Sequence, residues 1–301
     1  MMYKNLYAST AIAVIISALS ASAIAEGDTD KVVQTGKDTA LSKIDQLAGE
    51  YANDLVGGRL KHLEVSITED DWKMGGEALA VIGLSETDDS FTFTQLSTSR
   101  RHERTTMNAG IGYRQMTGDD TGIVGVNAFG DSEVNTGHQR VGFGLEYLSL
   151  SGSLHFNHYA RTSGEKTVKG VIEKAMSGED LAYRYRFDDK PFKPSVSVRG
   201  FRWRGDNGYE TSGSEFGVGL SITENVRFDM FHKDESKSKA ETRGQLSYVV
   251  TLGAEKAVEV QEAVGVSKQR ARLKQMMYQP VMRQNHIKKT TVNLGIVFTT
   301  G

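Results

Sequence analysis

Hydrophobic and polar side chains alternate along most of this chain. The stretch RTTMNAGIGYR (residues 104–114) places Met107, Ile111 and Tyr113 on every second position, and asparagine, glycine and arginine fill the places between. Successive side chains of a strand point to opposite faces, so this segment predicts a strand with one apolar and one polar face. A soluble sheet would bury the apolar face in its core, whereas a membrane barrel would turn it outward to lipid.

The same alternation recurs between Leu60 and Gly253. It is regular at 63–67, 91–95, 104–114, 124–128, 140–147, 154–157, 181–187, 216–222 and 246–252, and less regular at 76–86, 195–204 and 225–233. Runs of this length and period predict strands, and together they indicate an all-β fold of about twelve strands.

The two flanks of this region follow other patterns. Residues 31–56 carry apolar side chains at steps of three and four, which predicts an amphipathic helix. Residues 254–277 lack alternation and predict a second helix that becomes basic toward its end. The final TTVNLGIVFTT alternates again, and it suits a short paired strand, an emerging stub or a terminal strand that barrel-assembly machinery recognises.

The first residues have the layout of a secretory signal peptide. One lysine precedes a short apolar run from Ala11 to Leu19, and the triplet Ala-Ile-Ala stands directly before Glu26. The apolar run is too short to span a bilayer as a helix, so we expect a cleaved leader at residues 1–25.

The connections between the expected strands differ in length at the two ends. With the first strand running outward, one end has the short turns TDD, TGDDTG, SG, DDKPFKPS and TEN. The other end has EDDWKMGG, SRRHE, DSEVNTG and, longest of all, RTSGEKTVKGVIEKAMSG at 161–178. Short turns alternating with long loops are typical of bacterial outer-membrane barrels, whose long loops face outside the cell.

The polar face and the aromatic residues favour the membrane alternative. The polar positions hold glycine, asparagine, arginine and serine, which suit a crowded or water-filled lumen better than a soluble surface. Tyr113, Tyr147, Phe187 and Trp203 fall near expected strand ends, where interface girdles belong. The sequence therefore predicts a transmembrane antiparallel up-and-down β-barrel, rather than a secreted β-sandwich.

Composition narrows the functional classes. The chain has 301 residues and a formal net charge of -2, which argues against nucleic acid as a partner. Cysteine is absent, so disulfides and thiolate metal sites are excluded. His155 and His158 fall on opposite faces of one expected strand, which does not suit a shared metal. We expect no enzyme activity, metal or cofactor.

Several segments resemble the β-domain of the intimin/invasin family, the inverse autotransporters. They are FTFTQ (91–95), ERTTMNAGIGYR (103–114), GVNAFGD (125–131), GHQRVGFGLEY (137–147) and HFNHYARTSG (155–164), in the family's order and spacing. The later YQPVMRQNHI (278–287) is similar to the family's exit linker.

The resemblance implies a periplasmic N-terminal part, a twelve-stranded outer-membrane barrel, and a linker that threads the lumen toward an adhesive passenger. On this basis we expect a signal peptide at 1–25, a periplasmic helix at 26–56, the barrel at 57–253, and a helix and linker at 254–301. Because the sequence ends at Gly301, soon after the linker-like stretch, we expect the exported segment to be very short and adhesion itself to be in doubt.

A set of polar side chains is expected to point into the lumen and contact the linker. They are Gln95, Asn108, Arg114, Asn127, Asp131, Arg140, Glu146, Asn157, Tyr159, Arg184 and Arg186. Arginines and carboxylates across a narrow lumen would neutralise one another and hydrogen-bond the backbone of a threaded segment. Glycines at 110, 112, 125, 142 and 144 would make room for that segment.

The resulting functional prediction is an outer-membrane translocator or anchor for a C-terminal segment. One alternative is a porin-like channel in which residues 254–301 form a gate or plug. Another is a surface-binding barrel that acts through the loop at 162–178. Expected partners are outer-membrane lipid, barrel-assembly machinery, periplasmic chaperones and a host or neighbour-cell surface.

Overall fold

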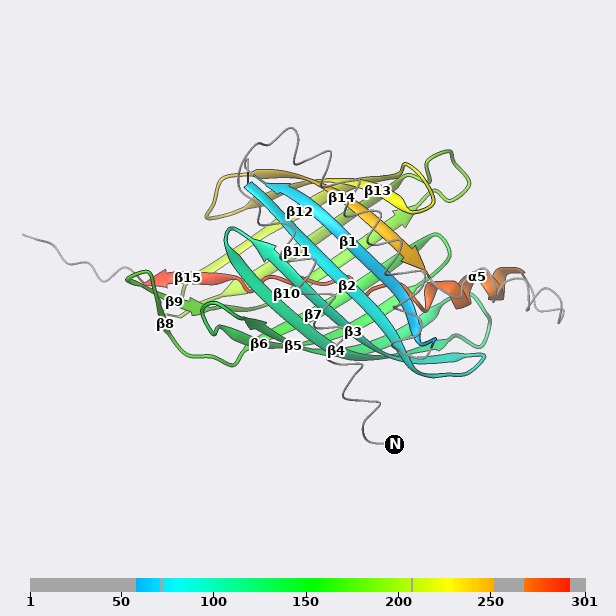
Figure 1. Ribbon diagram of the computed structural model, residues 1–301, viewed down its shortest axis with the longest axis horizontal. Coiled ribbons are helices and arrows are strands. Elements are labelled where there is room, and N and C mark those ends of the chain that lie inside the picture. The colour runs from blue at the N-terminus through cyan, green and yellow to red at the C-terminus, as the bar shows by residue number, and fades with distance from the viewer. Residues whose placement is uncertain (1–57, 71–72, 207, 252–267, 293–301) are drawn as a thin grey trace, which may run out of the picture.

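Twelve strands close into one antiparallel barrel (Figure 1). The computed structural model describes residues 58–70, 73–206, 208–251 and 268–292. Around the barrel the strand order is β1-β14-β13-β12-β11-β10-β7-β6-β5-β4-β3-β2, so each strand pairs with its sequence neighbours and β1 closes the ring on β14. The predicted up-and-down barrel is confirmed. The expected leader and the helix at 26–56 lie outside the described residues.

The barrel strands run for ten to fourteen residues each. They are β1 (Leu60–Asp70), β2 (Lys73–Glu86), β3 (Ser90–Arg101), β4 (Arg104–Met116), β5 (Ile123–Glu133), β6 (Gln139–Leu148), β7 (Gly152–Arg161), β10 (Ser177–Arg186), β11 (Ser195–Arg204), β12 (Glu210–Ser221), β13 (Val226–Glu235) and β14 (Glu241–Thr251). Strands of this length reach or exceed the roughly nine to eleven residues that a tilted strand needs to cross a bilayer.

The outer face of the barrel is apolar. Phe143, Leu145 and Ile111 expose 59, 57 and 54% of their surface, and neighbouring strands show the same alternation of exposed apolar and buried polar side chains. A soluble protein rarely exposes a contiguous apolar area of this kind, whereas a membrane barrel covers it with lipid tails. The apolar face of residues 104–114 is therefore the outer face.

Aromatic residues divide between the two faces. Tyr113 and Tyr147 are exposed on the outside, near the ends of β4 and β6. Trp203 was expected in a girdle, but only 4% of it is exposed, and it packs inside the barrel with its ring centroid 5.3 Å from that of Tyr159. The correction follows from strand parity: Phe201 and Trp203 share the face of β11 that is buried.

The expected difference in loop length between the two ends is largely absent, because the connections at one end are shorter than the sequence indicated. At one end, which we call the turn end, the loops are residues 87–89, 117–122, 149–151, 187–194 and 222–225. At the other end, the hairpin end, the fully described loops are 102–103, 134–138, 162–176 and 236–240. The connections from β1 to β2 and from β11 to β12 also lie at this end and include residues outside the described ranges. Only 162–176 is long, because at the other positions strand pairing continues into polar sequence such as Arg101 opposite Arg104.

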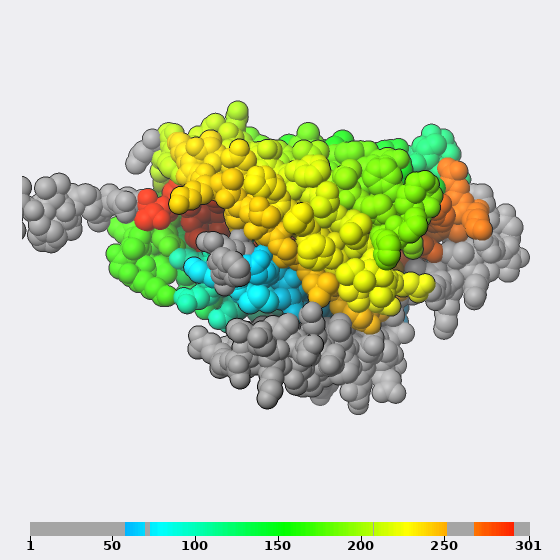
Figure 2. Space-filling model, turned by 90° about the horizontal axis from the view of Figure 1, so that it is seen from above, coloured from blue at the N-terminus to red at the C-terminus, as the bar shows by residue number. Residues whose placement is uncertain are grey.

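The C-terminal part begins and ends at opposite ends of the barrel (Figures 1 and 2). Helix α5 (Lys268–Met276) lies at the turn end, within the helix expected at 254–277, of which the residues before 268 are not described. Strand β15 (Lys289–Val292) lies at the hairpin end, in a three-stranded sheet with β9 (Val171–Ala175) and β8 (Lys166–Val168). Among the described helices, none has the length and hydropathy to cross a membrane.

Candidate functional site

Residues 277–288, which we call the linker, run through the lumen between α5 and β15. Met277, Tyr278 and Val281 are buried in a cluster with Phe91 and Phe93 of the barrel wall. Beyond this apolar part, the linker runs among polar wall side chains. An extended segment has no internal hydrogen bonds, so its buried backbone groups need partners on the wall.

Arg114 of β4 holds the first part of the linker. Its Nη1 donates to the carbonyl oxygens of Met277 and Gln279, at 2.6 and 2.5 Å. Its Nε and Nη2 donate to the two carboxylate oxygens of Glu146, at 2.7 and 3.0 Å. Glu146 therefore orients the guanidinium of Arg114, and Nη1 remains available to the linker backbone.

Other wall side chains bind the linker backbone further along. Three wall side chains donate to linker carbonyl oxygens: Asn157 to Met282 O at 3.0 Å, Asn108 to Asn285 O at 3.0 Å, and Arg140 to Gln284 O. Two wall oxygens accept from linker amides: Gln95 Oε1 from Val281 N and Tyr159 Oη from Gln284 N, both at 2.8 Å. All five of these contacts are made to backbone atoms of the linker. The wall can therefore hold an extended segment with little regard to its sequence.

Asp131 of β5 is the charged centre of the site. Arg283 of the linker donates to both of its carboxylate oxygens at 2.8 Å. Arg140 donates to Oδ2 at 2.6 Å and Asn108 to Oδ1 at 2.7 Å. The aspartate and both arginines are almost completely shielded from solvent, so the charges depend on one another for compensation.

Aromatic rings complete the binding surface for the arginines. The guanidinium carbon of Arg283 lies 4.2 Å from the ring centroid of Phe129, and that of Arg114 lies 4.6 Å from Phe93. Arg140 lies 4.2 Å over Tyr159. Such cation–π contacts gain strength where water is excluded.

The remaining expected residues lie on the lumen side without all reaching the linker. Arg186 donates to Gln279 Oε1 at 3.4 Å and to the carbonyl of Ser149 at 3.1 Å. Asn127 is buried beside Gly144, and its Nδ2 has no acceptor within the described part of the chain. Arg184 has Arg227, Asp229 and Glu64 as charged neighbours, and no hydrogen bond joins it to the described linker.

The lumenal glycines act differently from our expectation. A Cβ on Gly110 would lie 2.3 Å from the ring of Phe129, and one on Gly112 would lie 2.3 Å from Phe93. They make room for wall aromatics that pack against arginines, and so serve the linker indirectly. Of the five glycines, Gly142 has a linker atom among its nearest neighbours, with Arg283 Nη2 3.1 Å from the position of a Cβ.

A charged cluster fastens the linker where it leaves the lumen. Glu133 accepts hydrogen bonds from Arg104 at 2.8 Å and from Lys289 of β15. Arg104 also donates to both oxygens of Glu173 in β9, at 2.7 and 2.9 Å. Burial lowers the pKa of His138, whose Nε2 lies 3.6 Å from Glu173. We call this set the exit cluster.

Helix α5 is tied to the turn end by its basic side chains. Arg270 pairs with Asp89 and Asp120, and Gln269 donates to the carbonyl of Asp120 at 2.9 Å. Lys274 lies 3.4 Å from Glu86. The basic run that ends the expected helix therefore meets acidic turns of the barrel.

Sequence reasoning missed several residues of the site. Arg283 was read only as part of a linker-like stretch, and Arg199 and Glu77 were not singled out, although they bind Gln284 and Asn285 of the linker. Alternation could have placed Arg199 inside, because it lies between the exposed positions 198 and 200. The burial pattern of β2 is less regular around Glu77. Within the described residues, no group of three or more histidine, aspartate or glutamate side chains is arranged to hold a metal ion.

The sequence matches a family model described as the inverse autotransporter β-domain over residues 14–285. This chain belongs to that family. As an inverse autotransporter β-domain it resides in the bacterial outer membrane, and its apolar outer face meets membrane lipid.

Curated relatives of this inverse autotransporter β-domain include two Escherichia coli (strain K12) proteins. It is 34% identical over 101 residues to a putative attaching and effacing protein homolog, covering 33% of this chain and 34% of that protein. It is 38% identical over 83 residues to the inverse autotransporter adhesin YeeJ, covering 28% of this chain and 4% of that protein. The matched region is thus about a third of the first relative and a small part of the second.

Solved structures show the same fold. A chain from work on the in-meso crystallization of membrane proteins superposes with a TM-score of 0.67 at 18% identity, covering 77% of this chain and 100% of that chain. At this identity the likeness establishes the barrel fold alone.

Proposed function

We propose that the barrel anchors, and delivers to the cell surface, the chain that follows the linker. The observation that carries this proposal is the course of residues 277–288, which pass from α5 at the turn end, through the lumen, to β15 at the hairpin end. We place the turn end in the periplasm, because the longest described loop, 162–176, lies at the other end and long loops of outer-membrane barrels face outside the cell. In this orientation the linker leads outward.

The contacts of the linker fit this role. Arg114, Asn108 and Asn157 bind its carbonyl oxygens, which any passing segment presents. The Arg283–Asp131 pair and the exit cluster then select one final register, because they depend on particular side chains. A wall that is tolerant of sequence during passage and specific at rest is what a translocating anchor requires.

The decisive experiment is surface access to a tag placed after Val292. In whole cells, antibody or protease should reach such a tag, whereas a tag inserted in the turn 117–122 should become accessible only after the outer membrane is permeabilised. A C-terminal tag that stays hidden on intact cells, in a protein that fractionates with the outer membrane, would overturn the proposal.

The partners follow from the same role. We propose that periplasmic chaperones and barrel-assembly machinery handle the chain before insertion, and that the delivered segment acts at a host or neighbour-cell surface. One curated relative is named as an adhesin, and the long loop 162–176, with strands β8 and β9, lies beside the exit. Depletion of the assembly machinery should then reduce the amount of folded, heat-modifiable barrel.

We also propose that the chain is not an enzyme. The support comes from its family, in which a matched relative is named as an adhesin. In the described lumen, Arg114 is engaged with the linker, Tyr159 with Asp180, and Arg140 with Asp131. The purified protein should be assayed for phospholipase and protease activity. An activity that rises in proportion to the barrel concentration would contradict this proposal.

A further inference from the structure

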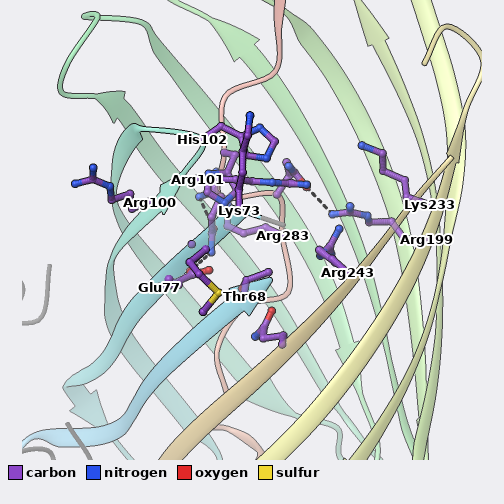
Figure 3. A pocket seen from close by; sticks show the side chains of 17 residues that line it. Thr68, Lys73, Glu77, Arg100, Arg101, His102, Arg199, Lys233, Arg243 and Arg283 are labelled. Atoms are coloured by element: carbon purple, nitrogen blue, oxygen red, sulfur yellow. Dashed lines mark hydrogen bonds between the residues drawn. The ribbon is translucent and has the colours of Figure 1, made fainter. Parts of the chain in front are cut away.

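Beside the linker, the hairpin end of the lumen contains a cavity that no described side chain fills. Its volume is about 170 Å³, far above the roughly 10–15 Å³ that a single water requires. The cavity lies between strands β1, β2, β13 and β14 on one side and linker residues 283–286 on the other (Figure 3).

The lining of this cavity is strongly basic. Seven of its residues are lysine or arginine, and Glu77 is the one acidic residue. Arg100 lies on the outer side of β3, as strand alternation and Figure 3 show. Five other basic residues line the cavity from separate strands: Lys73, Arg101, Arg199, Lys233 and Arg243. The guanidinium of Arg283, which also lines it, is engaged by Asp131 on the opposite wall.

Four of the described carboxylates around the cavity are each shared between two basic side chains. Glu215 is shared by Arg243, at 2.6 Å, and Arg199, at 3.2 Å. Glu241 is shared by Lys233 and Arg101.

Asp131 likewise serves both Arg283 and Arg140, and Glu235 serves both Lys233 and Lys288. Lys73 makes no ion pair with a residue of the described ranges. Among the described residues, these four carboxylates therefore pair with seven different cations, so the basic side chains outnumber them.

Arg199 has an unused donor at this site. Its Nη1 donates to Gln284 Oε1 of the linker at 2.8 Å, so the side chain bridges the wall and the linker. Its Nε is buried and has no acceptor in the described parts of the chain. Buried donors normally find an acceptor, and in this cavity a ligand oxygen is the chemistry that would supply one.

We propose that the cavity binds a small tetrahedral oxyanion, of the phosphate or sulfate type, between the wall and the linker. Ammonium and guanidinium groups that converge from several directions favour a compact anion with several acceptor oxygens. Such a ligand lies against linker residues 283–286 and contacts wall residues Lys73 and Arg243. It therefore stabilises the threaded arrangement, because it binds that arrangement more tightly than an emptied lumen. The site goes beyond the anchoring role, since ligand binding does not require that any segment be delivered.

The test uses the full chain, purified from outer membranes in detergent, with inorganic phosphate as the probe. Calorimetric titration at constant ionic strength against sodium chloride should show saturable binding to one site, and the unfolding temperature should rise with phosphate concentration. Glucose 6-phosphate serves as a second probe, which separates a free phosphate site from one that accepts a phosphomonoester on a surface glycan.

Two variants and one control locate the site. Lys73→Gln removes a cation without orphaning a carboxylate, and Arg243→Gln leaves Glu215 paired with Arg199. Each should weaken phosphate binding roughly tenfold, since one hydrogen bond to a charged group contributes about that much. Arg202→Gln is the matched control, because Arg202 lies on the exposed outer side of the strand that carries Arg199.

The outcomes are distinct. Saturable phosphate binding that both lumenal variants weaken and Arg202→Gln leaves unchanged supports the site, whether or not the sugar phosphate also binds. Absence of saturable binding in the intact, heat-modifiable protein, or equal affinity in all three variants, overturns it. Surface access to a C-terminal tag would be unaffected by either result, so the anchoring proposal is judged separately.

Discussion

Arg283 of the linker and Asp131 of strand β5 form a two-pronged ion pair inside the barrel, with both nitrogen-to-oxygen distances at 2.8 Å. The residues are separated by more than 150 positions in the sequence and are almost completely buried. Their pairing defines the register of the linker against the wall.

Removal of the Asp131 charge should loosen the linker. In Asp131→Asn, Arg283 and Arg140 would remain buried without compensation, at a cost of roughly 3–5 kcal/mol. We expect a lower unfolding temperature and faster protease cleavage within residues 277–288. Asp88→Asn, in an exposed turn, is the control and should leave both unchanged. An unaltered cleavage rate for Asp131→Asn would show that the pair does not hold the linker.

The planar geometry of the Arg114 guanidinium, and not only its positive charge, should stabilise the threaded linker. Arg114→Lys keeps a cation beside Glu146, but one ammonium cannot hold both carboxylate oxygens and two linker carbonyls in the same geometry. We expect a loss of about 1.5–3 kcal/mol in stability of the threaded state, measured by thermal unfolding. Arg202→Lys on the outer face is the control and should leave the unfolding temperature unchanged. If Arg114→Lys also unfolded at the wild-type temperature, the proposed binding of the linker backbone by Arg114 would be contradicted.

Added bulk at Gly142 should displace the linker. A Cβ at position 142 would lie 3.1 Å from Arg283 Nη2, and a valine adds two more methyl groups there. Overpacking of this kind lowers the free energy of unfolding by about 1–3 kcal/mol. We expect Gly142→Val to increase protease access to the linker. Gly200→Val is the matched control, because a Cβ on Gly200 meets no atom within 4 Å. Equal behaviour of the two variants would exclude steric contact at position 142.

The linker should also close the lumen to ions. The full chain is expected to conduct poorly in planar bilayers, and deletion of residues 268–301 should open a steady conductance. This outcome separates a threaded anchor from a porin-like channel, in which the intact protein would already conduct. Heat-modifiable mobility of the deletion variant checks that the barrel still folds.

The hairpin β8–β9 should loosen in acid. Hydrogen bonds from Lys174 and Arg161 lower the pKa of Asp206 below its ordinary 3.8, and a hydrogen bond from Lys169 lowers the pKa of Glu103 below 4.5. Lys169 and Lys174 belong to the loop that carries β8 and β9.

Because the folded pKa values lie below the unfolded ones, the stabilisation is complete above pH of about 4.5 and is lost as pH falls through the folded values. A spin label at Thr167 should report increased motion below that pH in the wild-type protein. In the double variant Asp206→Asn with Glu103→Gln, mobility should already be high at neutral pH and nearly independent of pH. A flat profile in the wild-type protein would show that these pairs do not order the hairpin.

Much of the barrel could be predicted from local pattern. Met107, Ile111 and Phe143 were expected to face lipid, and they do, because alternation assigns every second side chain of a strand to the same face. Parity also put Arg114 and Asp131 inside. Trp203 was misplaced because proximity to a strand end was given more weight than parity.

What the sequence determined by itself is this division of side chains between outside and inside, since it depends only on the geometry of neighbouring residues. Which interior groups meet was decided by tertiary structure. Strand stagger and the register of the linker bring Arg283 to Asp131, Arg114 to the carbonyl of Met277, and β15 to β9. Those distances depend on the closed ring as a whole, and no local repeat encodes them. The basic cavity arises in the same way, because residues of distant strands become neighbours only when β1 meets β14.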